Sequence, residues 1–190
     1  MSLLAHSKGD NVARKVVVYE LLSLDGVAED PDAYITEFDD VMEENLGRVI
    51  ATQDAVLLGR RTYDEWAAFW PSSDIEPFAS FINDVNKFVA TSTPTGELWS
   101  NTSIIDGDVL EQVTELKSRS GADIGVHGSI ELAQALLAAD LVDELRLVVA
   151  PALQASGRKL FDKGVSQRLT LTRNVSSPSG YLLLDFLVGK

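Results

Sequence analysis

Short apolar runs alternate along this chain with longer stretches in which apolar residues recur at helical spacing. Residues 16–22 are apolar apart from Glu20 and begin with β-branched residues, which predicts a buried strand. From Ile35 onward, Phe38, Met42 and Leu46 fall on one side of an amphipathic helix. Such alternation favours parallel strands joined by helical crossovers, with helices on both faces of one sheet.

The same patterns extend this alternation through most of the chain. Further strands are predicted at residues 55–58, 88–91, 104–105, 124–127 and 145–150, and further helices at 63–69, 78–85, 109–121 and 130–139, the last with Ser129 as its N-cap. Residues 169–175 and 181–188 flank a Ser/Pro/Gly turn and predict an antiparallel hairpin. We expect an α/β fold with a mostly parallel mixed sheet and a C-terminal hairpin.

Length and composition restrict both the organisation and the chemistry. The 190 residues favour one domain at 15–190, and the polar, aperiodic start predicts a mobile arm at 1–14. A net charge of -13 disfavours binding to nucleic acids or anionic membranes, and no apolar run approaches a membrane span, so we expect a cytoplasmic protein. Zero cysteines and two histidines argue against thiolate catalysis and a histidine- or cysteine-ligated metal site.

Three predicted strand-to-helix turns carry residues suited to a nucleotide. The first, Gly59 to Thr62, contains Arg60 and Arg61 at the start of a helix, where the helix dipole disfavours cations. Paired guanidinium groups bind a phosphate monoester well, which favours a phosphorylated dinucleotide. The alternative is that both arginines neutralise nearby acidic residues such as Asp64 and Glu65.

The other two turns give weaker signals. Thr91 and Ser92 offer hydroxyls to a ribose or phosphate, although such residues are also ordinary in turns. In the third turn, Gly128 allows close backbone approach before the helix that begins near Ile130. His127 is a candidate ligand or acid there, and the alternative is a hydrogen-bonded residue at a strand end.

Candidates for proton transfer and substrate binding come from different parts of the chain. Asp25, after the first strand, is a candidate catalytic acid if a cleft raises its pKa; beside Gly26 it also suits a plain turn. Asp39 is either a cleft residue or a solvated helix residue. Trp66 and Trp70 supply aromatic surface for a flat ring, or core packing. We expect the substrate to lie against Ser23, Asp39, Trp66 and Trp70.

Six segments in order resemble the dihydrofolate-reductase-like superfamily, in particular the C-terminal reductase domain of the bacterial bifunctional riboflavin biosynthesis deaminase/reductase. The segments lie at residues 23–26, 58–64, 87–92, 126–137, 141–145 and 157–161. The resemblance extends from about Lys15 to the C-terminus. It implies a three-layer sandwich, NADPH as hydride donor and possible homodimers.

The resemblance also implies roles for individual residues. Arg60, Arg61 and Thr62, with Gly59, would hold the adenosine phosphate, and Thr91 and Ser92 would lie near the adenine and ribose. His127, Gly128, Ser129 and Ile130 would meet the pyrophosphate, and Leu24 and Asp25 the nicotinamide and substrate. The Trp/Pro/Asp setting of folate reductases is absent, so we expect a pterin- or pyrimidine-like substrate. The alternative is a non-catalytic protein that binds a nucleotide or heterocycle on the same fold.

Overall fold

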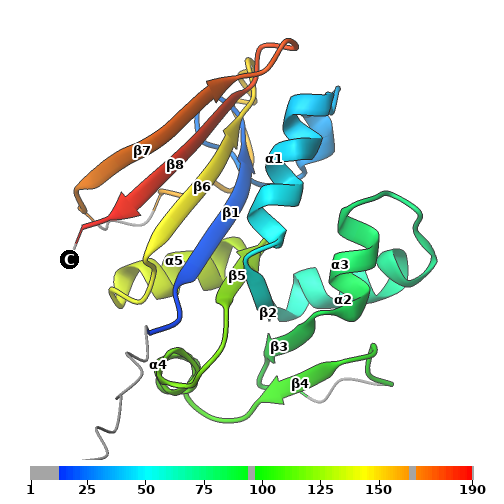
Figure 1. Ribbon diagram of the computed structural model, residues 1–190, viewed down its shortest axis with the longest axis vertical. Coiled ribbons are helices and arrows are strands. Elements are labelled where there is room, and N and C mark those ends of the chain that lie inside the picture. Colours follow the sequence, from blue (N-terminus) through cyan, green and yellow to red (C-terminus); the bar gives the residue numbers. More distant parts are fainter. Residues whose placement is uncertain (1–12, 94–96, 163–165, 190) are drawn as a thin grey trace, which may run out of the picture.

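The computed structural model describes residues 13–93, 97–162 and 166–189, which form one eight-stranded sheet covered by helices on both faces (Figure 1). The strands are β1 (Val16–Leu22), β2 (Gln53–Gly59), β3 (Asn86–Ala90), β4 (Thr102–Ile105), β5 (Asp123–His127), β6 (Glu144–Val149), β7 (Leu169–Ser176) and β8 (Leu182–Val188). The α-helices are α1 (Asp40–Ile50), α2 (Arg60–Phe69), α3 (Phe78–Asp84), α4 (Val109–Ser118) and α5 (Ile130–Ala138). Two 3-10 turns, η1 (Pro31–Ala33) and η2 (Trp70–Ser72), complete the elements.

The sheet is mixed, as predicted. Its strand order is β4-β3-β2-β5-β1-β6-β8-β7, and every neighbouring pair from β4 to β6 is parallel. Strand β8 pairs antiparallel with both β6 and β7, which confirms the C-terminal hairpin. Because β1, β2, β3 and β5 run the same way, their carboxyl ends meet at one edge of the sheet. The turns that follow β2, β3 and β5 are therefore brought together.

The core has two parts, one on each face of the sheet. Along β1, Val16, Val18 and Leu22 point toward the side covered by α4 and α5, whereas Tyr19 points toward the side covered by α1, α2 and α3. The other central strands alternate in the same way. This two-sided burial explains why the strands read as nearly continuous apolar runs rather than as alternating ones.

Three helix boundaries and the start of the domain differ from the sequence-based expectation, among them the end of α4, which lies at Ser118 rather than near Gly121. Helix α1 begins at Asp40 rather than near Ile35, because the Asp39 carboxylate caps it by accepting a hydrogen bond from the Met42 amide at 3.0 Å. Helix α2 begins at Arg60, three residues earlier than expected. Residues 1–12 of the expected arm lie outside the described residues, but Arg14 is buried and bonds to the Ala122 carbonyl, so it belongs to the folded domain.

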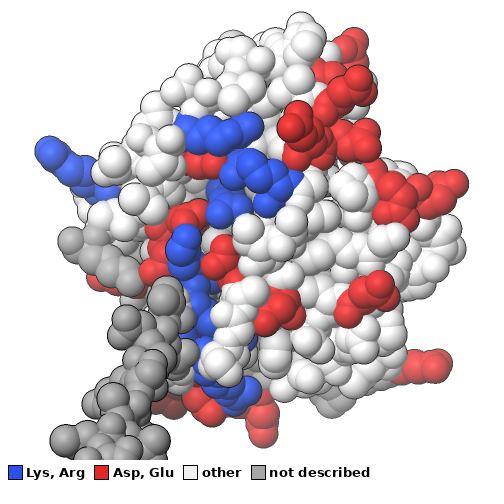
Figure 2. Space-filling model, viewed as in Figure 1, with Lys and Arg blue, Asp and Glu red and all other residues white. Residues whose placement is uncertain are grey.

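The surface around α1 is strongly acidic. Figure 2 shows acidic side chains gathered around α1 and a band of basic side chains beside them. Helix α1 contributes exposed Asp40, Glu43 and Glu44, while its Arg48 pairs with Asp185 of β8 at 2.9 Å. Among the helices of the described residues, none has the length and apolarity to cross a membrane.

Candidate functional site

The turns after β2 and β5 are fastened to each other by side chains. The Gly59 amide donates a hydrogen bond to Ser129 Oγ at 3.0 Å, and Thr62 Oγ1 donates to the Gly128 carbonyl at 2.9 Å. The expected capping bond is absent: Ser129 occupies the N-cap position of α5, but its hydroxyl serves Gly59 instead. The N-termini of α2 and α5 consequently lie next to each other, and Ile130, the first residue of α5, is buried.

Arg60 fastens the turn after β3 to the same group. Its Nε lies 2.6 Å from Asp64 Oδ2, and its guanidinium donates to Thr93 Oγ1 at 2.8 Å and to the Thr93 carbonyl at 3.1 Å. The same guanidinium reaches Thr91 Oγ1 at 3.5 Å, while Ser92 is exposed. Thus both interpretations of Arg60 apply in part: it neutralises Asp64, and it also holds the Thr91–Thr93 hydroxyls at the rim.

Arg61 is held far less tightly than Arg60. Its side chain is 63% exposed and lies 3.7 Å from a Glu29 oxygen. The same Glu29 oxygen accepts a 2.7 Å hydrogen bond from Arg158 Nε, and this bond lowers the pKa of Glu29. A further cation, Arg158, therefore lies beside Arg61 at this rim, and it was not among the site residues expected from the sequence. The sequence feature that could have indicated this site is the Arg158-Lys159 pair, which directly follows Gly157 in an otherwise acidic chain.

The turn after β5 requires glycine at its centre. Gly128 has a φ of +61°, and a Cβ there would lie 3.2 Å from the Trp66 ring. The Trp66 ring in turn meets Phe78 edge-on at 5.4 Å and Trp70 at 6.0 Å. Both tryptophans are thus packed in the aromatic cluster beneath the turn, which favours the core-packing interpretation over an open aromatic platform.

His127 lies inside the sheet–helix interface rather than at the rim. Its ring is 2% exposed, its Nε2 is 2.8 Å from Gln53 Oε1, and it packs against Phe78 and Phe81. Burial lowers the pKa of His127 to about 3, so the ring is neutral. The side chain therefore matches the alternative interpretation, a hydrogen-bonded residue at a strand end, and the expected cofactor contact of His127 stays a prediction for its backbone.

The loop after β1 is held by Asp25. The Asp25 carboxylate accepts hydrogen bonds from the amides of Gln154 and Ala155, each at 3.0 Å, and from Ser23 Oγ at 2.7 Å. These bonds, led by that of Gln154, lower the pKa of Asp25 to about 2. The expected raised pKa was wrong, and Asp25 is ionised at neutral pH. Ser23 is buried, while Leu24 is 63% exposed.

Asp39 serves the C-terminal hairpin as well as α1. Its second oxygen accepts a hydrogen bond from the Ser179 amide at 3.1 Å, in the turn between β7 and β8. Burial favours the neutral acid, but hydrogen bonds from Ser177, Met42 and Ser179 outweigh it and lower the pKa of Asp39 to about 2. The structure therefore gives this carboxylate a capping role, unlike the substrate contact expected from sequence.

Other features of the surface lie away from these turns. One hollow is lined by Gln53, Asp54, Ser80, Phe81, Asp84, Val85 and Asn86, at the amino ends of β2 and β3 and hence at the opposite edge of the sheet. A second lies between α4 and the end of α5. Within the described part of the chain, no group of three or more His, Cys, Asp or Glu side chains could hold a metal ion.

Comparisons with known proteins agree with this architecture. The model of the RibD C-terminal domain family matches residues 14–183. YyaP of Bacillus subtilis (strain 168), an uncharacterized protein, is 28% identical over 183 residues, which covers 86% of this chain and 90% of YyaP. A putative riboflavin biosynthesis protein from Shewanella sp. PV-4 superposes with a TM-score of 0.75 at 17% identity, covering 93% of this chain and 99% of that one.

A longer protein has the same fold in part of its chain. It is a diaminohydroxyphosphoribosylaminopyrimidine deaminase/5-amino-6-(5-phosphoribosylamino)uracil reductase from Thermotoga maritima. The superposition has a TM-score of 0.68 at 15% identity, and covers 93% of this chain and 57% of the Thermotoga protein. At such identities the superpositions establish the fold, which is the dihydrofolate-reductase-like fold expected from the six segments.

Proposed function

We propose that this chain, which belongs to the RibD C-terminal domain family, is a reductase that transfers hydride from NADPH to a small conjugated heterocycle of pyrimidine or pterin type. The observation that carries the proposal is the joining of three turns at one sheet edge, through the Gly59–Ser129 and Arg60–Thr93 hydrogen bonds. The turns after β2 and β5 lead into helices, whereas the turn after β3, expected to lead into a helix, leads to strand β4. Ligands of open α/β sheets bind at this edge. A structural relative named as a uracil reductase supports the same chemistry.

The residues at this edge fit a phosphorylated dinucleotide. Two helices begin side by side, and helix N-termini attract anions. Gly128 lets the backbone come close to a ligand, and the exposed Arg61 guanidinium has room for a phosphate. We assign Arg60 and Arg61 to the adenosine phosphate, Thr91 and Ser92 to the adenine and ribose, and the Gly128–Ile130 backbone to the pyrophosphate. NADPH supplies the hydride when it is bound.

The remaining residues position the reacting groups. The Asp25 carboxylate joins the loop after β1 to the amides of residues 154 and 155, and so fixes the exposed Leu24 at the rim where the nicotinamide would meet substrate. Because Asp25 is ionised at neutral pH, we assign it this positioning role. Water then provides the proton that completes the reduction.

Binding of the two nicotinamide cofactors tests the assignment of the arginines. We expect NADPH to raise the melting temperature and quench tryptophan fluorescence more than NADH does. Arg61→Ala should remove most of this preference, because a charge-assisted phosphate bond contributes about 1.5–3 kcal/mol, or roughly ten- to a hundredfold in affinity. Arg60→Ala should also loosen the turn at Thr93.

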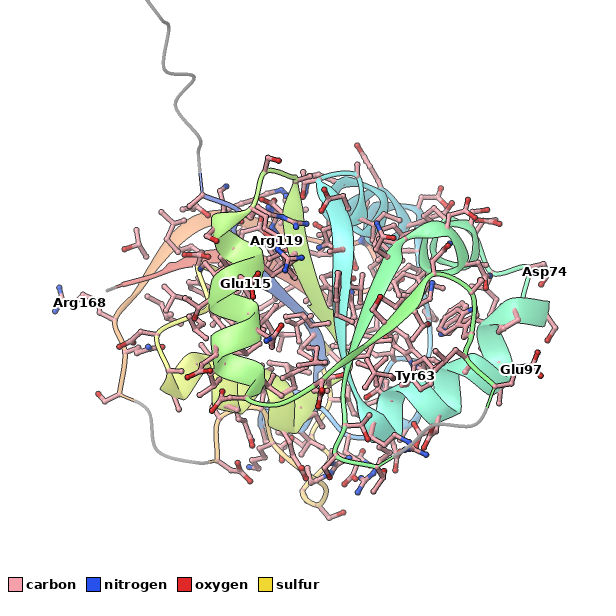
Figure 3. All side chains as sticks on the ribbon, turned by 90° about the horizontal axis from the view of Figure 1, so that it is seen from below. Tyr63, Asp74, Glu97, Glu115, Arg119 and Arg168 are labelled. Atoms are coloured by element: carbon pink, nitrogen blue, oxygen red, sulfur yellow. The ribbon has the colours of Figure 1, made fainter. Side chains whose placement is uncertain are left out.

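A matched control removes the same charge elsewhere. Figure 3 places Arg168 at the far end of the molecule from Tyr63 of α2. Arg168→Ala should therefore leave the NADPH preference unchanged. Equal responses to NADPH and NADH in the wild-type protein would contradict the proposed phosphate site.

Turnover requires a separate measurement. NADPH oxidation, followed by absorbance, is measured against a panel of pterins and pyrimidines. We expect at least one member to be reduced at a rate that Arg61→Ala lowers. NADPH binding without oxidation against the whole panel would instead favour the non-catalytic binding protein.

A further inference from the structure

A buried acid lies in the middle of the central strand β1. Glu20 is 3% exposed, and its Oε1 makes no hydrogen bond. Its position between Val18 and Leu22 places its side chain on the face of the sheet that α5 covers, and its neighbour on β6 is Leu147. A charged carboxylate in such surroundings destabilises the fold unless it is paired, so the group is more stable in its neutral, protonated form.

The strand register places this carboxyl beside the start of α5. Tyr19 of β1 pairs with His127 of β5, so Glu20 lies next to Gly128 and Ser129, whose amides oppose the effect of burial on its pKa. The same turn is fixed in place by the bonds of Ser129 Oγ to Gly59 and of the Gly128 carbonyl to Thr62. The N-terminus of a nine-residue helix therefore faces a buried acid with one unpaired oxygen. The proposed function assigns this same backbone to an anionic ligand.

Burial sets the charge state of this acid. Loss of solvent raises the pKa of Glu20 to about 8, and the two amides offset that effect only in part. Near neutral pH most of the molecules thus carry a proton on Glu20.

The other ionisable groups around Glu20 are of two kinds. Some are neutral near neutral pH, and the others belong to an ion pair. Burial raises the pKa of Tyr19 and of Tyr34 well above the usual range and lowers that of His127, so all three are neutral. At the start of α5, Glu131 is exposed and lies 3.6 Å from Arg158. The proton on Glu20 is therefore the one that an incoming anion would influence most.

We propose that Glu20 couples anion binding at the N-terminus of α5 to proton uptake, so that a pyrophosphate group occupies the Gly128 and Ser129 amides only while Glu20 is protonated. The inference rests on the proposed function, because it concerns the same pyrophosphate position. Two anions cannot share the same pair of amide donors without strong repulsion. A protonated Glu20 removes that repulsion and adds an O–H donor.

Calorimetric titration measures the coupling directly. NADPH, and separately inorganic pyrophosphate, is titrated into the protein between about pH 6 and about pH 9, in buffers of different ionisation enthalpy. We expect net proton uptake on binding, and a Kd that weakens roughly tenfold per pH unit above about pH 8. Glu20→Gln, which keeps the shape and is always neutral, should bind both ligands without this uptake.

The chain offers a matched control at the same helix. Glu131→Gln removes an equal charge from the first turn of α5, but from a side chain that is 72% exposed. This variant should keep the proton uptake of the wild type. Absence of uptake in the wild type, or uptake that persists in Glu20→Gln, overturns the proposal.

The two ligands separate this inference from the proposed function. Pyrophosphate binding with Glu20-dependent uptake, and no NADPH binding, supports the coupling and contradicts the reductase. NADPH binding that is the same in wild type and Glu20→Gln supports the reductase and contradicts the coupling. If neither NADPH nor pyrophosphate binds, both the reductase and the coupling are overturned.

A measurement on the wild type covers the case in which Glu20→Gln does not fold. The NMR signals of the Gly128 and Ser129 amides are followed through a pH titration with and without pyrophosphate. We expect the midpoint to move to higher pH when the ligand is present. An unchanged midpoint overturns the proposal.

Discussion

The amide of Gly59 donates to the hydroxyl of Ser129 at 3.0 Å, so two residues seventy positions apart join the carboxyl ends of neighbouring strands β2 and β5. We predict that Ser129→Ala lowers the free energy of unfolding by about 1–3 kcal/mol, because the Gly59 amide loses its partner. It should also weaken NADPH binding, since only the Thr62–Gly128 hydrogen bond then joins the two helix N-termini. Ser103→Ala, at an exposed position of β4, should change neither in the same denaturation and binding assays.

The close pair formed by Gln53 and His127 depends on Gly125. A Cβ at Gly125 would lie 2.7 Å from His127 Nε2 and closer still to Gln53 Oε1. We predict that Gly125→Ala destabilises the protein by about 1–3 kcal/mol in urea denaturation, because both buried side chains must move. Gly47→Ala is the control: its Cβ would meet nothing within 4 Å, and in helix α1 it should stabilise by up to about 1 kcal/mol. Equal effects of the two variants would contradict the packing described.

Asp25 makes stability depend on pH in a defined direction. Its pKa is lowered to about 2 in the folded protein, so its contribution is present above its unfolded value and is lost as the pH falls through about 2. We predict that Asp25→Asn lowers the melting temperature at neutral pH, and that the difference from wild type shrinks as the medium is acidified below about pH 4. Asp74→Asn, at an exposed site, should melt like the wild type. A pH-independent difference for Asp25→Asn would count against the linkage.

The buried side chain of Lys87 caps the C-terminal end of α3 by hydrogen bonding to its carbonyl groups. This fully buried ammonium donates to the carbonyls of Ile82 at 2.8 Å and Val85 at 2.9 Å, and lies 4.5 Å from the centre of the Trp99 ring. We predict that Lys87→Met lowers the free energy of unfolding by at least about 2 kcal/mol, because buried carbonyls lose their donor. The measurement is chemical denaturation followed by tryptophan fluorescence.

A surface ion pair provides the contrast for Lys87. Arg119 and Glu115 both lie on or beside α4, in the foreground of Figure 3, with 2.8 Å between Arg119 NH2 and Glu115 Oε1. Each side chain is more than half exposed. Arg119→Ala should therefore cost less than about 0.5 kcal/mol. A similar loss for the two variants would refute the buried role of Lys87.

The order and type of the elements followed from the sequence because periodicity is a local property. The apolar run at residues 16–22 became β1 at the same bounds, and the hairpin around the Ser/Pro/Gly turn formed as predicted. The start of α1 was placed too early, because an apolar spacing continues through Phe38 whereas the Asp39 cap decides where the helix begins. Six short segments in the right order were enough to identify the family.

The use of each polar side chain was decided by the tertiary structure alone. Ser129 suited a helix cap by local rules, but Gly59 competes for its hydroxyl across two strands. Asp25 and Glu20 are both carboxyls, yet their pKa values move in opposite directions: three donors surround one, and burial dominates the other. Desolvation and hydrogen-bond supply depend on which distant segments pack together. The sequence by itself thus determined the order and type of the helices and strands. The packing of distant segments determined the protonation states and hydrogen-bond partners of the polar side chains at the site.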